Sequence, residues 1–385
     1  MNNLTSLDAN EIYSLGLMSG TSLDGIDIAY VKHEEVQNDV KHTLIHFATF
    51  PYDEALKAKI FRNLSDETSK ISEICELNKE LGIAYRDAIK AFLKMFDLSV
   101  DCFSFIAIHG QTMYHNPNAK HPSTLQLGDM SEVSLAFNKT VVYDFRSLDT
   151  AALGQGAPLV PIVNYELFKN QAPVMLLNIG GISNITYLPD RKIENVIAFD
   201  TGPGNMLVDD LMQELYNLPY DEDGKIAKSG ELNEALLNYL LNDDYYEQTP
   251  PKSTGREKYN HQFVLAIIKY SQSLKLKKAD IIKTVTHLTS LVISQAIDKF
   301  IKHKNYPLIV SGGGTHNQYM MDVLKEQGFN VLINDDTFSD GLEAYSFAIL
   351  GYLRLKGKYA NMPNVTGAHE LVRLGSIILP PKEGQ

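Results

Sequence analysis

Short apolar runs alternate with amphipathic stretches along most of this 385-residue chain. Three runs of strand length, at Phe103–Ile108, Val174–Ile179 and Pro307–Val310, each end in a polar or glycine-rich turn. Between Lys70 and Leu98, apolar residues recur every three or four positions, which predicts a long amphipathic helix. Strands that alternate with helices in this way are typical of an α/β fold.

The same periodicities predict the other elements. Helices are expected at residues 55–64, 130–137, 160–168, 206–216, 231–241, 261–274, 281–300 and 342–355. Strands are expected at residues 124–127, 140–145, 184–188, 196–199 and 330–333. Apart from its one helix, the segment from residue 219 to 256 is polar and irregular.

The first apolar run, Leu15–Met18, is interrupted by a polar turn and resumes at Ile26, which predicts a β-hairpin. The turn contains two glycines, three hydroxyl side chains and an acid. Gly20 and Gly25 allow main-chain N–H groups to face an anion, and Asp24 is suited to hold a metal that bridges phosphates. This hairpin is therefore predicted to bind phosphates.

A second hairpin of the same kind lies between Val174 and Tyr187, with Gly180 and Gly181 in its turn. Two such hairpins predict two related lobes with a nucleotide cleft between them. The Gly- and Pro-rich segment Ala151–Pro161 marks the expected crossing from one lobe to the other. We expect the first lobe to comprise residues 1–147 together with 343–385, and the second to comprise residues 148–342.

Four glycine-rich turns lie at or just after strand ends, at Ser19–Gly25, Gly180–Asn184, Thr201–Asn205 and Gly312–Gly314. Ligands of α/β folds collect at the carboxyl ends of strands, so the four turns are expected to converge on one site. Any one of these turns, taken alone, is equally well explained as an ordinary tight turn or as part of a ligand site. None has the Walker lysine, or a G-x-G-x-x-G with an acid at ribose distance, which argues against a P-loop NTPase and an ordinary dehydrogenase.

Asp200 is the main candidate for an acid–base residue. It follows an apolar strand and precedes Thr-Gly-Pro-Gly, a position that exposes one carboxylate without a like charge next to it in sequence. Such a group can act as a general base on a hydroxyl or a water beside a phosphate. The alternative is that it caps the turn or the helix that begins near Asn205, and we favour the base.

Polar residues also follow other strands. Gln111 and Asp144 are candidates for hydrogen bonds to sugar hydroxyls, and Arg146 for a carboxylate, a phosphate or a salt bridge between the lobes. His109 is expected to be a satisfied, half-buried histidine rather than a catalytic one. The cationic segment Lys252–Arg256, taken alone, is expected to be a solvated loop.

Composition narrows the class of protein. A formal net charge of −12 argues against nucleic-acid binding, and 44% hydrophobic with 21% charged residues is typical of a soluble globular protein. Two cysteines give neither a disulfide framework nor metal-ligand spacing, which favours a cytoplasmic location. No signal peptide or membrane-spanning run is visible, so we expect no membrane partner.

Taken together, these motifs resemble the anhydro-N-acetylmuramic acid kinase family of the sugar kinase/actin/heat-shock-ATPase superfamily. The motifs follow the family's order over nearly the whole chain. They are GLMSGTSLDGID (16–27), HGQT (109–112), DFR (144–146), GQGAPLVP (154–161), NIGGISN (178–184), FDTGPGN (199–205), KSTGRE (252–257), GGGTHN (312–317) and NVTGA (364–368).

The resemblance implies two ribonuclease H-like lobes and the use of ATP and Mg²⁺ on 1,6-anhydro-N-acetylmuramic acid, a product of cell-wall turnover. It implies that Asp200 activates the water that opens the anhydro bridge while the freed 6-oxygen takes the γ-phosphoryl group. The implied nucleotide contacts are Gly20, Thr21, Ser22, Leu23, Asp24, Gly25, Ile26, Asp27, Gly180, Gly181, Gly312, Gly313, Gly314 and Asn317. The implied sugar contacts are Gln111, Thr112, Asp144 and Arg146. A homodimer is suggested by the resemblance alone.

Two departures from the family pattern are visible. The superfamily's usual Asp before the first Gly-Thr is replaced by Met18 and Ser19, which leaves the metal to Asp24 or Asp27. The family's Pro before its Glu-Ala helix is absent from Ser339–Ala344. Two alternatives stay open, a kinase of an ordinary free sugar in the same fold and a sugar or nucleotide sensor without turnover.

Overall fold

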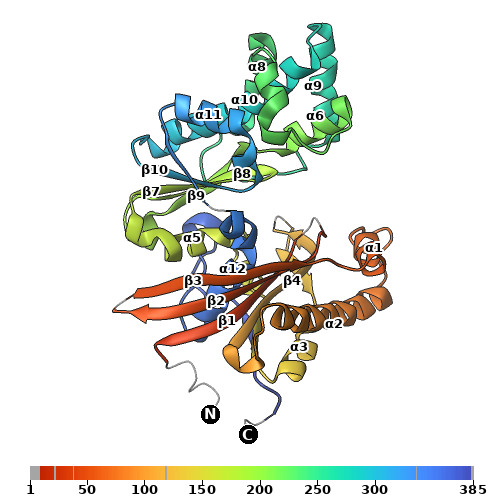
Figure 1. The fold of residues 1–385 in the computed structure, drawn as a ribbon, viewed down its shortest axis with the longest axis vertical. Coiled ribbons are helices and arrows are strands. Elements are labelled where there is room, and N and C mark those ends of the chain that lie inside the picture. Colours follow the sequence, from red (N-terminus) through yellow and green to blue (C-terminus); the bar gives the residue numbers. More distant parts are fainter. Residues whose placement is uncertain (1–8, 21–22, 38, 118, 335, 383–385) are drawn as a thin grey trace. The chain divides into compact units, whose positions relative to one another are not determined.

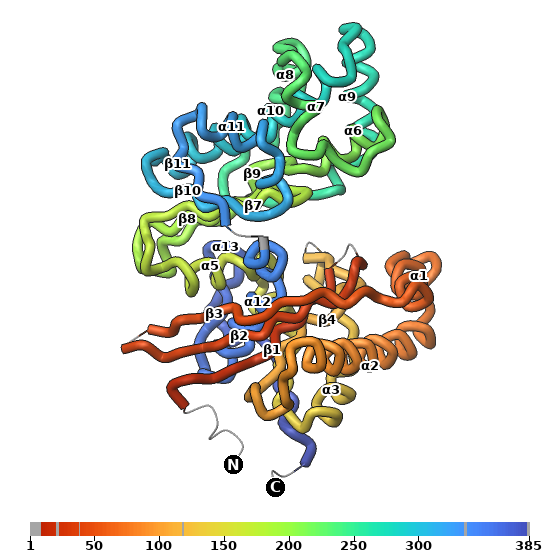
Figure 2. Tube along the Cα trace, viewed as in Figure 1, coloured from red at the N-terminus to blue at the C-terminus, as the bar shows by residue number. Residues whose placement is uncertain are grey.

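The computed structural model describes residues 9–20, 23–37, 39–117, 119–334 and 336–382. The chain forms two compact units, Met1–Leu167 with Asp340–Gln385, and Phe168–Ser339. It leaves the first unit at the end of α5 (Val160–Phe168) and returns to it within α12 (Asp336–Leu355), as the trace in Figure 2 shows.

The first unit is built on a sheet in the order β12-β6-β4-β1-β2-β3, with β5 paired to β4. Figure 1 labels β1, β2, β3 and β4 of this sheet. β1, β2 and β3 are antiparallel, whereas β4 is parallel to both β1 and β6. The strands are β1 (Glu11–Ser19), β2 (Ile26–Val36), β3 (Asp39–Phe50), β4 (Phe105–Asn116), β5 (Ser123–Leu127), β6 (Thr140–Tyr143) and β12 (Ser376–Ile378).

The second unit repeats this arrangement in the order β9-β8-β7-β10-β11. β7, β8 and β9 are antiparallel, whereas β10 is parallel to both β7 and β11. The strands are β7 (Val174–Ile179), β8 (Ile182–Leu188), β9 (Ile197–Pro203), β10 (Pro307–Ser311) and β11 (Asn330–Ile333). In chain order, both sheets therefore place their first five main strands as 3-2-1-4-5, and the prediction of two related α/β lobes is confirmed.

Each unit also contains helices. The first unit has α1 (Glu54–Arg62), α2 (Ile71–Met95), α3 (Met130–Phe137), α4 (Ser147–Ala151), α5, most of α12, and α13 (Pro363–Thr366). The second has α6 (Met206–Tyr216), α7 (Lys225–Ser229), α8 (Glu234–Leu241), α9 (His261–Ser273), α10 (Lys278–Ala296) and α11 (Gln318–Glu326). In the described part of the chain, none of them has the length and apolar character needed to cross a membrane.

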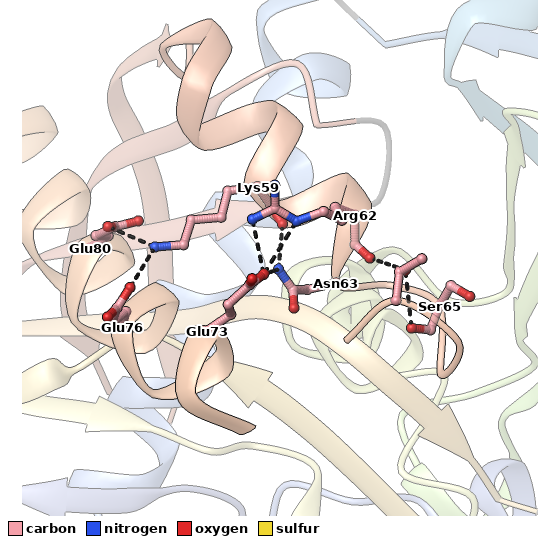
Figure 3. A network of polar contacts seen from close by, with 8 residues as sticks. Lys59, Arg62, Asn63, Ser65, Glu73, Glu76 and Glu80 are labelled. Carbon is pink, nitrogen blue, oxygen red and sulfur yellow. Dashed lines mark hydrogen bonds and ion pairs between the residues drawn. The ribbon is translucent and has the colours of Figure 1, made fainter. Parts of the chain in front are cut away.

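The first sheet is covered on both faces because successive side chains of a strand point to opposite sides. Leu15 and Leu17 of β1 belong to the core that includes Leu81, Tyr85 and Phe92 of α2. Gly16, between these two leucines in sequence, faces the opposite side of the sheet, and α12 packs against it there. Lys59 and Arg62 of α1 form ion pairs with three glutamates of α2 (Figure 3).

The first boundary between the units lies later than the predicted one at residues 147/148. α4, the following loop and α5 stay with the first unit because hydrogen bonds tie them to its C-terminal segment. Asp149 accepts from Thr366 and Asn361, and the N–H of Gln155 donates to Thr366 O at 2.8 Å. The return point at Ser339/Asp340 lies close to the predicted 342/343.

Two strands were not predicted from the sequence. β3 lies at an edge of its sheet, and its side chains are mostly half-buried rather than alternating between core and solvent. β12 has only three residues. Neither has a periodicity that single-sequence reasoning can detect.

Gly16→Ala tests the contact between β1 and α12. A Cβ atom at this position would overlap Ala344 O, Ala348 N and Ala348 Cβ, so α12 would have to move away from the sheet. We expect a loss of about 1–3 kcal/mol in the free energy of unfolding, measured by urea denaturation. Gly181→Ala is the matched control, because its φ is not in the left-handed region and only Met206 side-chain atoms lie near its missing Cβ, at 3.7 Å. Equal stability of the two variants would contradict the proposed packing.

Candidate active site

The turn of the first hairpin is held by buried residues of its own unit. Gln111 is fully buried in β4, and its side-chain amide donates to Gly20 O at 3.4 Å. Ser19 Oγ lies 3.0 Å from the hydroxyl of Tyr85. Two of the predicted phosphate contacts, Thr21 and Ser22, lie outside the described residues. Gln111, predicted as a sugar contact, thus fixes the start of the turn.

Several other turn residues have evident packing roles. Leu23 is buried with a φ of +59°, and Ile26 is also buried. A Cβ atom on Gly25 would collide with the main chain of Phe50, so glycine is required there by the approach of β3. Asp24 is exposed. Nucleotide binding by these residues remains a prediction.

A group of carboxylates surrounds the base of this hairpin. Asp27 is half-buried and accepts a hydrogen bond from Thr49 Oγ1 at 2.6 Å. Burial raises the pKa of Asp27, and the negative charges of Asp340 and Asp24 raise it further. Desolvation and the charge of Asp27 likewise raise the pKa of Glu343 in α12. Glu343 was not singled out from the sequence, although its Glu-Ala pair was noted.

Carboxylates that repel one another are suited to a hard cation. In the described part of the chain, no three His, Cys, Asp or Glu side chains gather as a complete metal site. Mg²⁺ is usually held by one or two carboxylates together with substrate phosphates and water. Asp24 and Asp27 are therefore a donor set that fits this ion only when phosphates complete it.

The predicted sugar contact Arg146 is held by a precise set of partners in the first unit. Its Nε donates to His109 Nε2 at 2.9 Å and its Nη1 donates to Gly156 O at 2.7 Å. Burial lowers the pKa of Arg146 to about 10, with the charge of Glu343 acting in the opposite direction.

His109 is buried, and its Nδ1 lies 2.8 Å from Gly110 O. Its Nε2 accepts from Arg146, so the ring is neutral with the proton on Nδ1. Burial and the charge of Arg146 keep its pKa well below the usual value. The expectation of a histidine with satisfied hydrogen bonds is confirmed, but the ring is fully buried rather than half-buried.

The remaining predicted sugar contacts lie on the same unit. Asp144 follows β6 with a φ of +55° and accepts a hydrogen bond from Ser147 Oγ at 2.5 Å. Thr112 follows Gln111 in β4 and accepts from Gln126 Nε2 at 3.4 Å. Both are half-buried, which leaves part of each side chain open to a ligand.

Asp149 joins three separate segments of the first unit. Its Oδ2 accepts the N–H of Gly156 at 2.7 Å, and its Oδ1 accepts from Asn361 Nδ2 at 3.0 Å and Thr366 Oγ1 at 2.9 Å. The side chain is fully buried. Because Gly156 also binds Arg146, the orientation of that guanidinium depends on this buried carboxylate.

In the second unit, the turns after β7 and β9 bind each other. The N–H groups of Gly204 and Asn205 donate to Gly181 O and Gly180 O, both at 2.8 Å. A Cβ atom on Gly204 would overlap Gly180 O, so this approach requires glycine. Gly181 is exposed, with no main-chain atom near its missing Cβ, and remains open to a phosphate.

The glycine run after β10 packs beside the same turn. Gly312 has a φ of +87°, and Gly314 is buried beneath Ile179 of β7. Gly313 is exposed. Asn317 is buried and caps α11 by accepting the N–H of Met320 at 3.1 Å. The structure thus brings Gly180, Gly181 and Gly312–Gly314 together, while the position of Asn317 is explained by capping.

Asp200 lies within β9 rather than after its end, which corrects the sequence-based placement. β9 extends to Pro203 because it pairs with residues Ile182 to Tyr187 of β8, and Asp200 is opposite Asn184. Its Oδ2 accepts the N–H of Thr254 at 3.0 Å. Among the described residues, the Asp200 carboxylate accepts from Thr254, and the N-cap residue of α6, Asn205, makes no side-chain capping hydrogen bond, so the helix-capping alternative is not supported.

The surroundings of Asp200 raise its pKa to about 6. Partial burial is the main cause, and Glu257 adds a like charge, whereas the Thr254 hydrogen bond and the charge of Lys252 oppose the rise. A carboxyl group with this pKa is ionised near neutral pH and can take up a proton during a reaction. Glu257 was not identified from the sequence as a neighbour, since it is distant along the chain.

The segment Lys252–Arg256 is not a solvated loop throughout, which contradicts the sequence-based expectation. Lys252 is only 8% exposed, and its Nζ donates to Tyr245 O at 3.0 Å. The main-chain O of Lys252 accepts the N–H of Asp200 at 3.1 Å. Ser253 and Arg256 are exposed. The ammonium group lies over the rings of Tyr245, close by in sequence, and of Phe199 and Phe300, which are distant in sequence.

Comparison with known proteins gives one consistent result. A family model described as anhydro-N-acetylmuramic acid kinase matches residues 12–380. A Bacillus cereus (strain 03BB102) protein named anhydro-N-acetylmuramic acid kinase is 40% identical over 383 residues, covering 96% of this chain and 100% of that protein. A protein of the same name from Bacillus anthracis (strain CDC 684 / NRRL 3495) has the same identity and coverage.

Among solved structures, component A of (R)-2-hydroxyglutaryl-CoA dehydratase from Acidaminococcus fermentans is 11% identical to this chain. The match covers 90% of this chain and 99% of that chain, with a TM-score of 0.45.

Thr366→Val tests the buried Asp149 junction. Valine fills nearly the same volume but cannot donate to Asp149 Oδ1, which leaves a buried carboxylate with one fewer donor. We expect a loss of about 1–3 kcal/mol in the free energy of unfolding in urea. Thr366→Ser keeps the hydroxyl and should lose clearly less stability. A Val variant as stable as the Ser variant would show that the hydrogen bond contributes little.

Proposed function

This chain belongs to the anhydro-N-acetylmuramic acid kinase family, and we propose how its residues carry out the reaction of that family. The enzyme is a kinase that opens 1,6-anhydro-N-acetylmuramic acid and phosphorylates it to N-acetylmuramic acid 6-phosphate in peptidoglycan recycling. The observation that supports a role for this chain's own residues is the partly buried carboxylate of Asp200, with a pKa raised to about 6.

We propose that Asp200 is the general base. It takes a proton from water as the water oxygen bonds to the anomeric carbon of the sugar. The bond between that carbon and the bridging oxygen breaks, and the freed 6-oxygen accepts the γ-phosphoryl group of ATP. The hydrogen bond from Thr254 to Oδ2 fixes the carboxylate, so that its other oxygen can face the water.

We propose that the first unit binds the sugar. Arg146 is the candidate for an anionic group of the substrate, because its Nε and Nη1 are already oriented by His109 and Gly156. Asp144 and Thr112 are half-buried and are the candidates for hydroxyl groups. Gln111 acts mainly by fixing Gly20, through the hydrogen bond described above.

The phosphate contacts of ATP are proposed at the two glycine-rich hairpin turns and at Gly312–Gly314. Exposed Gly181 and Gly313 support this assignment, because their main chain is accessible to a ligand. Asp24, with Asp27 close by, is proposed to hold Mg²⁺. When bound, this ion would neutralise phosphate charge during transfer. A cytoplasmic homodimer is also proposed, on the family resemblance alone.

The reaction is tested by ADP release with the anhydro-sugar, compared with free N-acetylmuramic acid, in ¹⁸O-labelled water. We expect turnover with the anhydro-sugar and uptake of ¹⁸O at the anomeric carbon. Asp200→Asn should lower kcat by about 100- to 10,000-fold, since it removes the general base, while calorimetry should still detect ATP binding. Near-normal turnover of this variant would exclude the assigned role. Preference for the free sugar would favour an ordinary sugar kinase.

The pKa of Asp200 also predicts the pH dependence of turnover. The base must be ionised, so kcat/KM should fall as the pH drops below about 6. Glu257→Gln removes a like charge that raises this pKa, and the acidic limb should therefore move to lower pH. Exposed Glu194→Gln is the matched control and should leave the limb in place. A limb that moves to higher pH in Glu257→Gln would contradict the electrostatic assignment.

A further inference from the structure

Asp200 is held by hydrogen bonds from one short part of the chain. The hydroxyl of Tyr245 donates to Asp200 O at 2.8 Å, and Asp200 N–H donates to Lys252 O at 3.1 Å. Thr254 N–H then donates to the carboxylate at 3.0 Å. The main chain and the side chain of Asp200 thus both depend on the position of residues 245–254.

Lys252 is the buried centre of this segment. Its ammonium group donates to Tyr245 O and lies 4.5 Å from the ring centre of the same tyrosine. The ring centres of Phe300 and Phe199 are 5.3 and 5.9 Å away. Phe199 is the neighbour of Asp200 in β9, so the rings that enclose the lysine include one from the strand that carries the acid.

Stability alone does not account for a lysine at this position. A methionine would fill a similar volume without the cost of removing a charge from water, and such replacements of buried charges are often neutral or stabilising. Burial lowers the pKa of Lys252 to about 8, which reflects that cost. The positive charge is close enough to favour ionisation of Asp200.

We propose that Lys252 is a positioning residue for the reaction. Its ammonium group, enclosed by aromatic rings and bound to Tyr245 O, anchors the loop whose Thr254 N–H orients the Asp200 carboxylate. The same charge keeps that carboxylate ready to accept a proton. This inference rests on the proposal that Asp200 is the general base.

Lys252→Met tests the inference. We expect kcat to fall about 10- to 100-fold, which is less than the loss expected when the general base itself is removed. The KM values for ATP and for the anhydro-sugar should each change less than about twofold. The acidic limb of the pH profile should move to higher pH, because the cation that favours the ionised carboxylate is gone. Lys252→Arg should recover most of kcat. Lys269→Met, at an exposed position of α9, is the matched control and should resemble the wild type.

The outcomes separate the two proposals. A Lys252→Met enzyme with normal kcat and an unmoved limb, beside an inactive Asp200→Asn, would overturn the positioning role and leave the base in place. An active Asp200→Asn would overturn the general base and this inference with it. If circular dichroism shows that Lys252→Met does not fold, Lys252→Gln replaces it, since glutamine keeps a donor for Tyr245 O. That variant should show the same shift of the limb, and an unmoved limb would refute the role of the charge.

Discussion

The close packing of α12 on β1 at Gly16 is the contact on which the first unit depends. α12 brings Glu343 near Asp27 and Arg146, and the chain after it delivers Asn361 and Thr366 to the carboxylate of Asp149. Asp149 in turn binds Gly156, whose carbonyl receives Arg146. The absence of a side chain at Gly16 is thereby linked, through this series of contacts, to the orientation of the Arg146 guanidinium.

In the second unit, the pKa of Asp200 is set by a balance between desolvation and neighbouring charges. Partial burial alone would push Asp200 toward its neutral form, and Glu257 acts in the same direction. The Thr254 hydrogen bond and the Lys252 charge favour the ionised form. The resulting pKa near 6 leaves a carboxylate that is charged at neutral pH yet more basic than an exposed aspartate. Part of the stability of the fold is given up for this property, since a folded-state pKa above the unfolded value means that ionisation opposes folding.

The features that could be predicted from the sequence are those determined by residues close together in the chain. The two hairpins, helix α6 and the satisfied state of His109 follow from local periodicity, glycine placement and residue chemistry. The burial of Lys252 could not be foreseen in this way, because its enclosing rings come from residues 199, 245 and 300. The length of β9 was underestimated because its end is set by pairing with β8. The boundary between the units was placed too early because Asp149 and Gln155 bind residues more than 200 positions later.

The second unit is one continuous segment inserted between the two pieces of the first. During synthesis, residues 168–339 are complete before most of α12 and all of β12 have been made. The second unit can therefore fold on the ribosome as it emerges, as domains generally do. The Gly16 face of the first sheet meanwhile stays uncovered until α12 has been made. During this part of translation the nascent chain exposes an apolar surface. Interrupted synthesis would leave that surface without α12, the helix that covers it.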